Sequence, residues 1–264
     1  MLGRPIAHSL SPVLHRAAYA ALGLGWTYRA VDCGVVELPA TLHRLAADHA
    51  GVSLTKPLKL AAAGLVGSSD PIAAEVGAVN TIVFNGAEPS AWIGYNTDVA
   101  GVVAAVRETG VEVTGAPALV LGAGGAARAA VTALIRLGAD PITVCARRME
   151  AAVEVAALGG AAAGWAAAPR LVTGARLVVS TVPPAAAEEL AGAGWPASAA
   201  VVDVIYQGWP TGLGRLAGAA GAPVVGGLAM LVAQAAEAVR LMTGREPPVA
   251  AMREAGERAL SSKH

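Results

Sequence analysis

Three polar residues stand out in this largely apolar chain: Lys59, Asn80 and Asp98. Together their side chains could donate or accept a proton in a reaction. Oxidation of an alcohol by a nicotinamide requires a group that takes the hydroxyl proton as the hydride leaves. A lysine oriented by a carboxylate is one of few such groups that need no zinc, tyrosine or histidine. Lysine is rare here, because only Lys56, Lys59 and Lys263 occur. The alternative is that the lysines are solvated and that Asp98 caps a helix.

Two serines near the start of the chain could bind an anion. The segment His8-Ser9-Leu10-Ser11-Pro12 precedes a helical pattern. Ser11 followed by Pro12 is typical of a helix N-cap with proline at the first helical position, and we expect that arrangement. Hydroxyl groups beside a helix N-terminus are also natural donors to a carboxylate, so the two interpretations are compatible.

A glycine-rich turn in mid-chain predicts a nucleotide site. The apolar run Ala118–Leu121 ends in G-A-G-G-A-A, after which a helical pattern leads to a second strand, Ile142–Cys145. Gly122 would permit the tight turn, Gly124 the close approach of a pyrophosphate, and Ala127 close packing of helix and strand. The helix N-terminus offers free N–H groups to that pyrophosphate. Strand, glycines, helix and strand in this spacing therefore indicate a dinucleotide.

The end of the second strand indicates which dinucleotide. A site for NAD places an Asp or Glu there, beside the ribose 2′-hydroxyl. Here the strand runs into Ala146, Arg147 and Arg148, and no carboxylate occurs before Glu150. A guanidinium can bind a 2′-phosphate that a carboxylate would repel. We therefore expect Arg147 and Arg148 to favour NADP, although two solvated loop arginines would look the same.

Composition narrows the class of protein. The chain has 264 residues, a formal net charge of zero and no basic block, so neither nucleic acid nor a membrane is expected as a partner. Its start has no apolar signal segment, which favours the cytoplasm. Cys33 and Cys145 are expected to be buried free thiols, and no metal-ligand spacing occurs. The residues for proton transfer and nucleotide binding, rather than composition, predict a small-molecule substrate, and a homodimer is left open.

The elements that must position these residues alternate along the chain. An α/β fold is expected, with an N-terminal α/β substrate domain (1–98), a Rossmann-type doubly wound NADP-binding domain (99–226) and C-terminal helices (227–264) that return to the first domain. The Ala-rich stretch 159–168 is interpreted as low complexity. Beyond the nucleotide turn, the expected strands are Trp26–Asp32, Gly51–Thr55, Thr81–Phe84 with Ala91–Gly94 as a hairpin, Leu177–Ser180, Val201–Ile205 and Pro223–Val225.

Seven short blocks occur in one order along nearly the whole chain. They are H-S-L-S-P, V-S-L-T-K-P-L-K, G-A-V-N-T, N-T-D, G-A-G-G-A-A, D-V-I-Y and G-L-A-M-L-V-A-Q. In order and spacing this set closely resembles the shikimate dehydrogenase family. The resemblance implies reduction of 3-dehydroshikimate to shikimate with NADPH, a step toward chorismate and the aromatic amino acids.

The resemblance also implies roles for individual residues. Ser9 and Ser11 would bind the substrate carboxylate, and Lys59 and Asp98 would be the catalytic pair. The remaining substrate contacts would be Thr55, Asn80, Tyr206 and Gln234. The cofactor would be bound by Gly122, Gly124, Gly125, Ala126 and Arg147, with Arg148 beside it, and Thr181, Val204 and Gly227 would line the nicotinamide side.

The chain departs from the family pattern at several positions. Ser53 replaces a common Asn, and Gly226 replaces a common Asp. The cofactor loop is Ala-Arg-Arg here, where the family often has Asn-Arg-Thr. The turn that begins at Ser180 lacks the Asn that is usual in the family. Only two residues precede Gly3, so the family's first strand is expected to be missing and to leave a gap with unpaired backbone. A late start or a truncated chain is the favoured explanation.

Other functions remain open at this point. The nearest is a quinate/shikimate or aminoshikimate dehydrogenase that uses NAD. Arg147 and the missing carboxylate count against NAD, whereas Ser53 leaves room for a different substrate. A non-catalytic nucleotide-binding regulator would be expected to have lost Lys59 or Asp98, and both are present. A folate-type methylene dehydrogenase would leave the two serines near the start unexplained.

Overall fold

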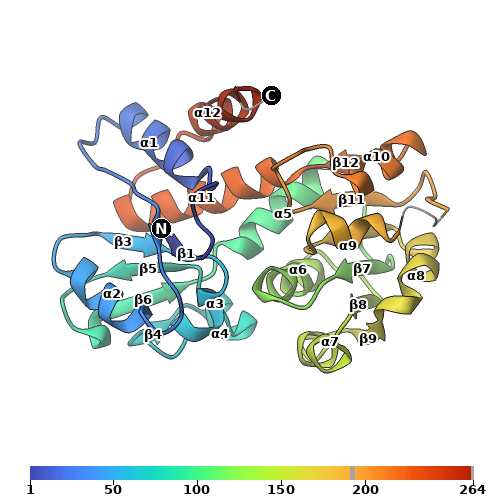
Figure 1. Ribbon diagram of the computed structural model, residues 1–264, viewed down its shortest axis with the longest axis horizontal. Helices are drawn as coiled ribbons and strands as arrows, with labels where there is room; N and C mark the ends of the chain where they lie inside the picture. Colours follow the sequence, from blue (N-terminus) through green and yellow to red (C-terminus); the bar gives the residue numbers. More distant parts are fainter. Residues whose placement is uncertain (191–193, 263–264) are drawn as a thin grey trace. The chain divides into compact units, whose positions relative to one another are not determined.

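The computed structural model describes residues 1–190 and 194–262 (Figure 1). The chain divides into two compact units. The first comprises Met1–Asp98 and Leu231–His264, and the second comprises Val99–Met230. Each unit has its own sheet and its own apolar core, so each is described separately.

The first unit contains a mixed four-stranded sheet in the order β3-β5-β6-β4 and a two-stranded pair, β1-β2. Strands β5 and β6 are antiparallel with Phe84 opposite Trp92, which confirms the expected hairpin. The core beneath the sheet includes Leu38, Leu58 and Ile82, all fully buried. The strands are β1 (Leu2–Gly3), β2 (Val31–Asp32), β3 (Gly51–Ser53), β4 (Ser68–Ser69), β5 (Thr81–Phe84) and β6 (Trp92–Tyr95).

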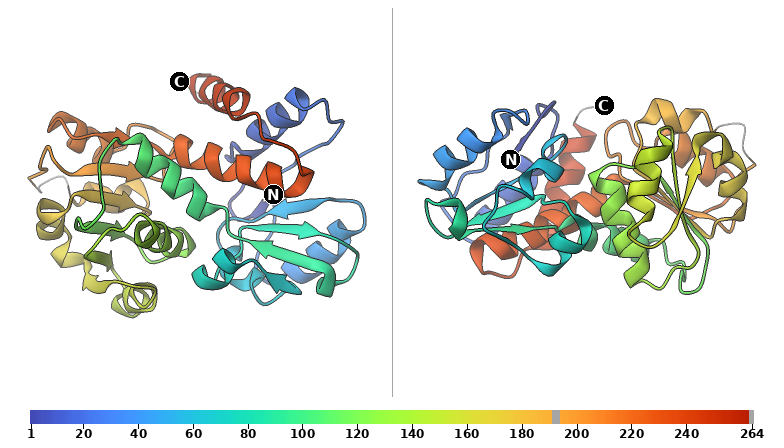
Figure 2. Two further views of the ribbon diagram at one scale, coloured as in Figure 1. Left: turned by 180° about the vertical axis from the view of Figure 1, so that it is seen from behind. Right: turned by 90° about the horizontal axis from the view of Figure 1, so that it is seen from below.

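Helices from both ends of the chain belong to this unit. Figure 1 and Figure 2 show α12 lying beside α1, and the two helices pack against each other. The helices are α1 (Ser11–Ala21), α2 (Leu38–Ala46), α3 (Leu58–Ala62), α4 (Pro71–Val76), the 3-10 turn η1 (Pro89–Ala91), α11 (Gly227–Thr243), which belongs here from Leu231 on, and α12 (Val249–Ser261).

The expectation of a missing first strand is only partly correct, because a first strand of two residues is present. Leu2 and Gly3 form β1, which pairs in parallel with β2 on one side. On the other side Leu2 bridges Leu54, and its carbonyl accepts a 3.0 Å hydrogen bond from the Thr55 amide. Leu2 is 1% exposed. Two residues of strand therefore occupy the position between β2 and β3, and residues 26–30, just before β2, are not part of any strand.

The second unit is built on a six-stranded parallel sheet in the order β12-β11-β10-β7-β8-β9. The chain runs outward from β7 in one direction through β8 and β9, and in the other through β10, β11 and β12. This is the doubly wound α/β arrangement that the pattern predicted. The strands are β7 (Ala118–Leu121), β8 (Ile142–Ala146), β9 (Ala161–Gly164), β10 (Leu177–Ser180), β11 (Ala200–Asp203) and β12 (Val224–Val225).

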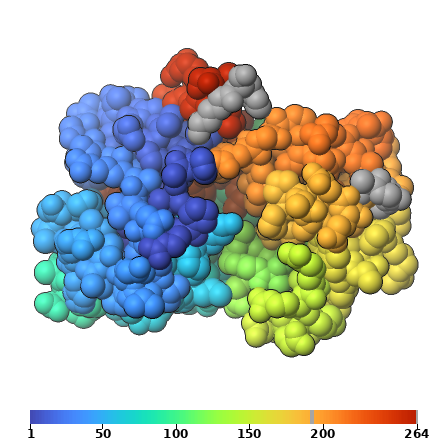
Figure 3. Space-filling view, in the orientation of Figure 1, coloured from blue at the N-terminus to red at the C-terminus, as the bar shows by residue number. Residues whose placement is uncertain are grey.

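Helices lie on the faces of this sheet (Figure 1), and Figure 3 shows the surface from the same side. Cys145 is buried in the core between sheet and helices, and Cys33 is buried in the first unit, which confirms the expected free thiols. Within the described residues, no helix has both the length and the apolar character needed to cross a membrane. The helices are α5 (Asp98–Glu108), α6 (Gly125–Arg136), α7 (Met149–Ala156), the 3-10 turn η2 (Trp165–Ala167), α8 (Ala168–Gly174), α9 (Pro184–Glu188) and α10 (Gly212–Ala219).

Two parts of the chain differ from the expected pattern. Strand β9 lies in the Ala-rich stretch interpreted as low complexity, because pairing with β8 outweighs the weak strand propensity of alanine. In the expected strand Trp26–Asp32 only Val31 and Asp32 are paired as β2. In both cases pairing with a neighbour, which local composition does not report, decides the outcome.

Candidate active site

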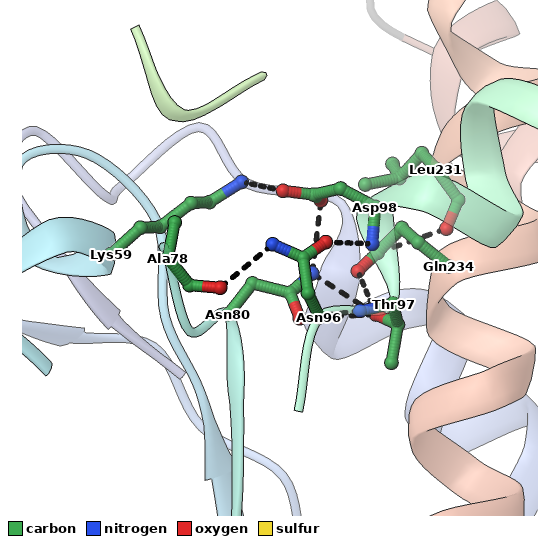
Figure 4. Close-up of polar contacts among 8 residues, drawn as sticks. All are labelled: Lys59, Ala78, Asn80, Asn96, Thr97, Asp98, Leu231 and Gln234. Carbon is green, nitrogen blue, oxygen red and sulfur yellow. Dashed lines mark hydrogen bonds and ion pairs between the residues drawn. The ribbon is translucent and has the colours of Figure 1, made fainter. Parts of the chain in front are cut away.

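Lys59 and Asp98 form an ion pair in the first unit (Figure 4). The Lys59 Nζ atom donates to Asp98 Oδ2 over 2.5 Å. The side chains are 16% and 4% exposed, so the pair is largely shielded from water while the ammonium keeps some access. Coulomb attraction is stronger in such surroundings than at the surface. The carboxylate therefore holds the ammonium in a defined place.

Asn80 holds the other side of the same carboxylate. Its Nδ2 atom donates to Asp98 Oδ1 over 2.9 Å and to Thr97 Oγ1 over 3.0 Å. Its Oδ1 atom accepts from the Thr97 amide over 2.8 Å. Both oxygens of Asp98 thus have a donor, and the Asn80 amide is itself fixed from two directions. A carboxylate held in this way can orient Lys59 without turning.

Asn96 and Thr97 complete the network, and the sequence pattern had given neither a role. Asn96 Nδ2 donates to the Ala78 carbonyl over 2.8 Å, and its Oδ1 accepts from the Asp98 amide over 3.1 Å. Thr97 Oγ1 lies 3.4 Å from Gln234 Oε1 on α11. The signal that would have identified these residues is the unbroken N-T-D triplet after β6.

Sheet register explains why these residues meet. Thr81 pairs with Ser53 on one side and with Tyr95 on the other. Asn80, just before β5, therefore lies at the same edge of the sheet as Asn96, just after β6. Lys59 approaches from α3, and its carbonyl accepts a 2.8 Å hydrogen bond from the Val79 amide. Two antiparallel strand ends and one helix thus bring together residues from three blocks.

The other substrate-side candidates lie close to the start of the first unit. Thr55 follows β3, and its amide pairs with Leu2. The expected N-cap at Ser11 is wrong, because Leu10 occupies the N-cap and Ser11 is the first helical residue. The hydroxyl of Ser9 instead accepts a 3.2 Å hydrogen bond from the Ser11 amide. The turn before α1 is thus closed by Ser9, and Ser11 is 3% exposed.

The glycine turn of the second unit has the backbone shape and the open space that a bound phosphate group would need. Gly122 has φ +109°, and a Cβ there would come within 2.3 Å of Thr181 Oγ1, so only glycine fits. A Cβ at Gly124 would meet no atom within 4 Å, so the space over its backbone is open. Gly125 and Ala126 begin α6, a helix of 12 residues. The turn and the helix N-terminus therefore fit a pyrophosphate.

A pocket of about 560 Å³ adjoins this turn. Arg147 and Arg148 line it, both are exposed, and no carboxylate is among its lining residues. Its cationic and apolar lining fits the adenosine 2′-phosphate half of NADP better than that of NAD. The lining residues are Gly122, Ala123, Gly124, Ala146, Arg147, Arg148, Ala151, Trp165, Thr181, Val182 and Pro183.

The remaining candidates of this unit follow strands β10 and β11. Thr181 Oγ1 donates to the Leu121 carbonyl over 2.8 Å beside the glycine turn. Val204 follows β11, and a Cβ at Gly227 would come within 2.2 Å of its carbonyl oxygen, so backbone and backbone touch there. Tyr206, a substrate-side candidate, lies in this unit and is partly buried, apart in the chain from the Lys59 network.

Asp203 supports the turn that carries Val204 and Tyr206. Its Oδ2 atom accepts from Thr211 Oγ1 over 2.7 Å and its Oδ1 atom from the Ile205 amide over 3.1 Å. Burial raises the pKa of the Asp203 carboxyl, and these hydrogen bonds oppose that rise. The sequence had marked this position only as the first letter of the D-V-I-Y block.

The two units together define a class of protein. A doubly wound sheet with a glycine turn and arginines at the next strand end is a nicotinamide-nucleotide domain, and the other unit carries a lysine–aspartate pair suited to proton transfer. The class is a two-domain nucleotide-dependent oxidoreductase.

Comparison with known proteins names the family within that class. Residues 1–82 match the family model "Shikimate dehydrogenase substrate binding domain", and residues 227–255 match "Shikimate 5'-dehydrogenase C-terminal domain". A shikimate dehydrogenase (NADP(+)) of Halobacterium salinarum is 42% identical over 266 residues, which cover 97% of this chain and 96% of that protein. The chain belongs to the shikimate dehydrogenase family.

Solved structures agree over nearly the whole chain. The crystal structure of Mycobacterium tuberculosis shikimate dehydrogenase matches with a TM-score of 0.86 at 40% identity, covering 98% of this chain and 97% of that one. The Thermus thermophilus shikimate 5-dehydrogenase, in complex with NADP(H) and shikimate, matches with a TM-score of 0.86 at 36% identity, covering 98% of both chains. The α/β fold and the expected family are thereby confirmed.

Proposed function

We propose that this protein is an NADP-dependent dehydrogenase that interconverts 3-dehydroshikimate and shikimate, with Lys59 and Asp98 as its catalytic pair. The activity and the cofactor are those of its relatives, which are 36–42% identical over nearly their full length. The observation that carries the assignment of residues is the contact between Lys59 Nζ and Asp98 Oδ2. Asn80 supports it by holding the second carboxylate oxygen.

Lys59 moves the proton of the reaction. NADP, when bound, supplies or accepts the hydride at the carbon that bears the reacting oxygen. In the reducing direction the Lys59 ammonium gives a proton to the carbonyl oxygen, and a neutral amine remains until it takes a proton from water. Oxidation reverses both transfers. Asp98 keeps the Nζ atom in place.

Other residues of the first unit hold the substrate. The hydroxyls of Ser9 and Ser11 bind its carboxylate, since both lie at the turn into α1. Thr55, Asn80 and Gln234 are the further substrate contacts proposed in this unit. The role of Tyr206 as a substrate contact stays a prediction from the resemblance. Residues 1–98 and 227–264 are therefore assigned to the substrate, and residues 99–226 to NADP.

The second unit holds the cofactor. Gly122, Gly124, Gly125 and Ala126 approach the pyrophosphate, Arg147 and Arg148 bind the 2′-phosphate, and Thr181, Val204 and Gly227 line the nicotinamide side. The product would lead toward chorismate and the aromatic amino acids, and we place the reaction in the cytoplasm. One chain carries both the proposed catalytic pair and the nucleotide pocket, so we propose that a single chain is active. Light scattering would show whether the protein is a monomer or a homodimer.

Initial rates with shikimate and quinate, each with NADP and with NAD, test this assignment. We expect shikimate with NADP to give by far the highest kcat/KM. A quinate dehydrogenase that uses NAD would invert both preferences. A nucleotide-binding regulator would show cofactor binding without turnover with either substrate. Either result would overturn the proposed function.

A further inference from the structure

Trp165 is a lining residue of the nucleotide pocket that neither the glycine motif nor the family blocks point to. It follows β9, inside the Ala-rich stretch. Strands β8 and β9 are parallel neighbours, and their last residues, Ala146 and Gly164, are paired. Arg147 and Trp165 are therefore the next residues beyond two adjacent strand ends, and both line the same pocket.

The indole is oriented by a hydrogen bond. Trp165 Nε1 donates to Glu189 Oε2 over 2.5 Å, which satisfies the only polar atom of the side chain. Leu171 and Val182 pack with it against the core of the second unit. The ring is thus anchored at its nitrogen edge, packs in part on the core, and also lines the pocket. An aromatic ring held in this way can stack on a base at little cost in conformational entropy.

An adenosine 2′-phosphate has a charged phosphate and a flat aromatic base, and the pocket has arginines and an indole that could bind one each. Guanidinium groups match the phosphate, and an aromatic face matches the base. We propose that Trp165 is the adenine-binding residue of the pocket and stacks on the base while Arg147 and Arg148 bind the 2′-phosphate. This inference rests on the proposed function, because it takes NADP as the ligand.

Calorimetric titration with adenosine 2′,5′-bisphosphate tests the inference without any need for turnover. We expect Trp165→Ala to weaken binding about tenfold, which corresponds to ~1.4 kcal/mol. Trp165→Phe keeps an aromatic ring and should recover most of that loss, even though it lacks the hydrogen bond to Glu189. Affinity for nicotinamide mononucleotide and for inorganic pyrophosphate, which carry no adenine, should be unchanged in both variants.

Fluorescence provides a second readout of the same contact. Adenosine 2′,5′-bisphosphate should quench the emission of the wild-type protein, and the quench should be lost in Trp165→Phe. Trp26→Phe is the matched control, since Trp26 lies in the first unit and is 40% exposed, and it should keep the quench. Thermal midpoints of all variants establish that they fold.

The outcomes separate the inference from the proposed function. A wild-type protein that does not bind adenosine 2′,5′-bisphosphate would contradict the proposed NADP site itself. If the wild type binds and Trp165→Ala binds equally well, only the role of Trp165 is overturned. An equal loss of pyrophosphate affinity in Trp165→Ala would also overturn it, because the residue would then act through the shape of the loop.

Discussion

Lys59 and Asp98 lie 39 positions apart in the chain, and their Nζ and Oδ2 atoms are 2.5 Å apart. The two residues come from different elements, α3 and the start of α5. Asp98 is almost fully buried, so its charge depends on Lys59 and on the amide of Asn80 for compensation. The pair is therefore sensitive to the loss of either member.

Replacing Lys59 should abolish most turnover without loss of the cofactor. We expect Lys59→Ala to lower kcat by about 10²- to 10⁴-fold, the range for removal of a general acid or base. NADP affinity, measured by calorimetry, should stay within about twofold, because the nucleotide pocket lies in the second unit.

Lys56→Ala is the matched control for this variant. Lys56 lies three positions earlier and is exposed, so its loss should leave kcat within about twofold of the wild type. Similar activity in Lys59→Ala and Lys56→Ala would remove Lys59 from the proposed mechanism.

The preference for NADP should depend on the arginines after β8. We expect Arg147→Ala and Arg148→Ala each to raise the KM for NADP by about ten- to a hundredfold, since each removes a charge-assisted contact to the 2′-phosphate. The KM for NAD, which lacks that phosphate, should stay unchanged.

Steady-state kinetics with both cofactors measure this effect. Arg170→Ala is the control, because Arg170 is an exposed arginine of the same unit on α8 and is not among the lining residues of the pocket. Equal losses with NADP and NAD in the Arg147 and Arg148 variants would show that the arginines do not read the 2′-phosphate.

The sequence predicts those features of the structure that depend on residues close together in the chain. The glycine turn, the hairpin and strand β7 follow from short patterns, and the structure has them where they were expected. The contact of Asn96 with the Ala78 carbonyl requires the register of β5 on β6, which no local pattern reports. Trp165 was hidden for a similar reason, since β9 becomes a strand only by pairing with β8. The roles given to individual site residues stay predictions.

Asp203 should act as a positioning residue for the turn after β11. We expect Asp203→Ala to raise the KM for shikimate several-fold, because the variant loses the hydrogen bonds to Thr211 Oγ1 and the Ile205 amide that hold the turn before Tyr206. The NADP affinity, measured by calorimetry, should change far less.

Thr211→Ser tests the same contact conservatively. The serine hydroxyl can still donate to Asp203 and accept from the Gly214 amide, so this variant should behave as the wild type. If Asp203→Ala loses activity only in proportion to the fraction of protein that unfolds, Asp203 has a role in stability alone.

His15 should make the protein less stable in mild acid. Its ring is buried, stacks on Tyr28 with centroids 3.9 Å apart, and has its pKa lowered to about 3 by that burial. The unfolded chain takes up a proton near pH 6.5, and the folded chain does so only near pH 3. Stability is therefore fully present above pH 6.5 and falls as the pH drops toward 3, by up to ~1.4 kcal/mol per pH unit.

Thermal or urea unfolding at pH 7.5 and pH 5.0 measures this loss. Between these two pH values the titration of His15 should lower the free energy of unfolding of the wild type by about 2 kcal/mol. A residue that does not titrate would cause no such loss. His15→Phe keeps a flat ring against Tyr28 and removes the titration, so its stability should change by about 2 kcal/mol less over the same interval. Because the whole effect depends on the histidine staying neutral in the folded state, parallel pH dependences of the two proteins would mean that His15 is protonated there.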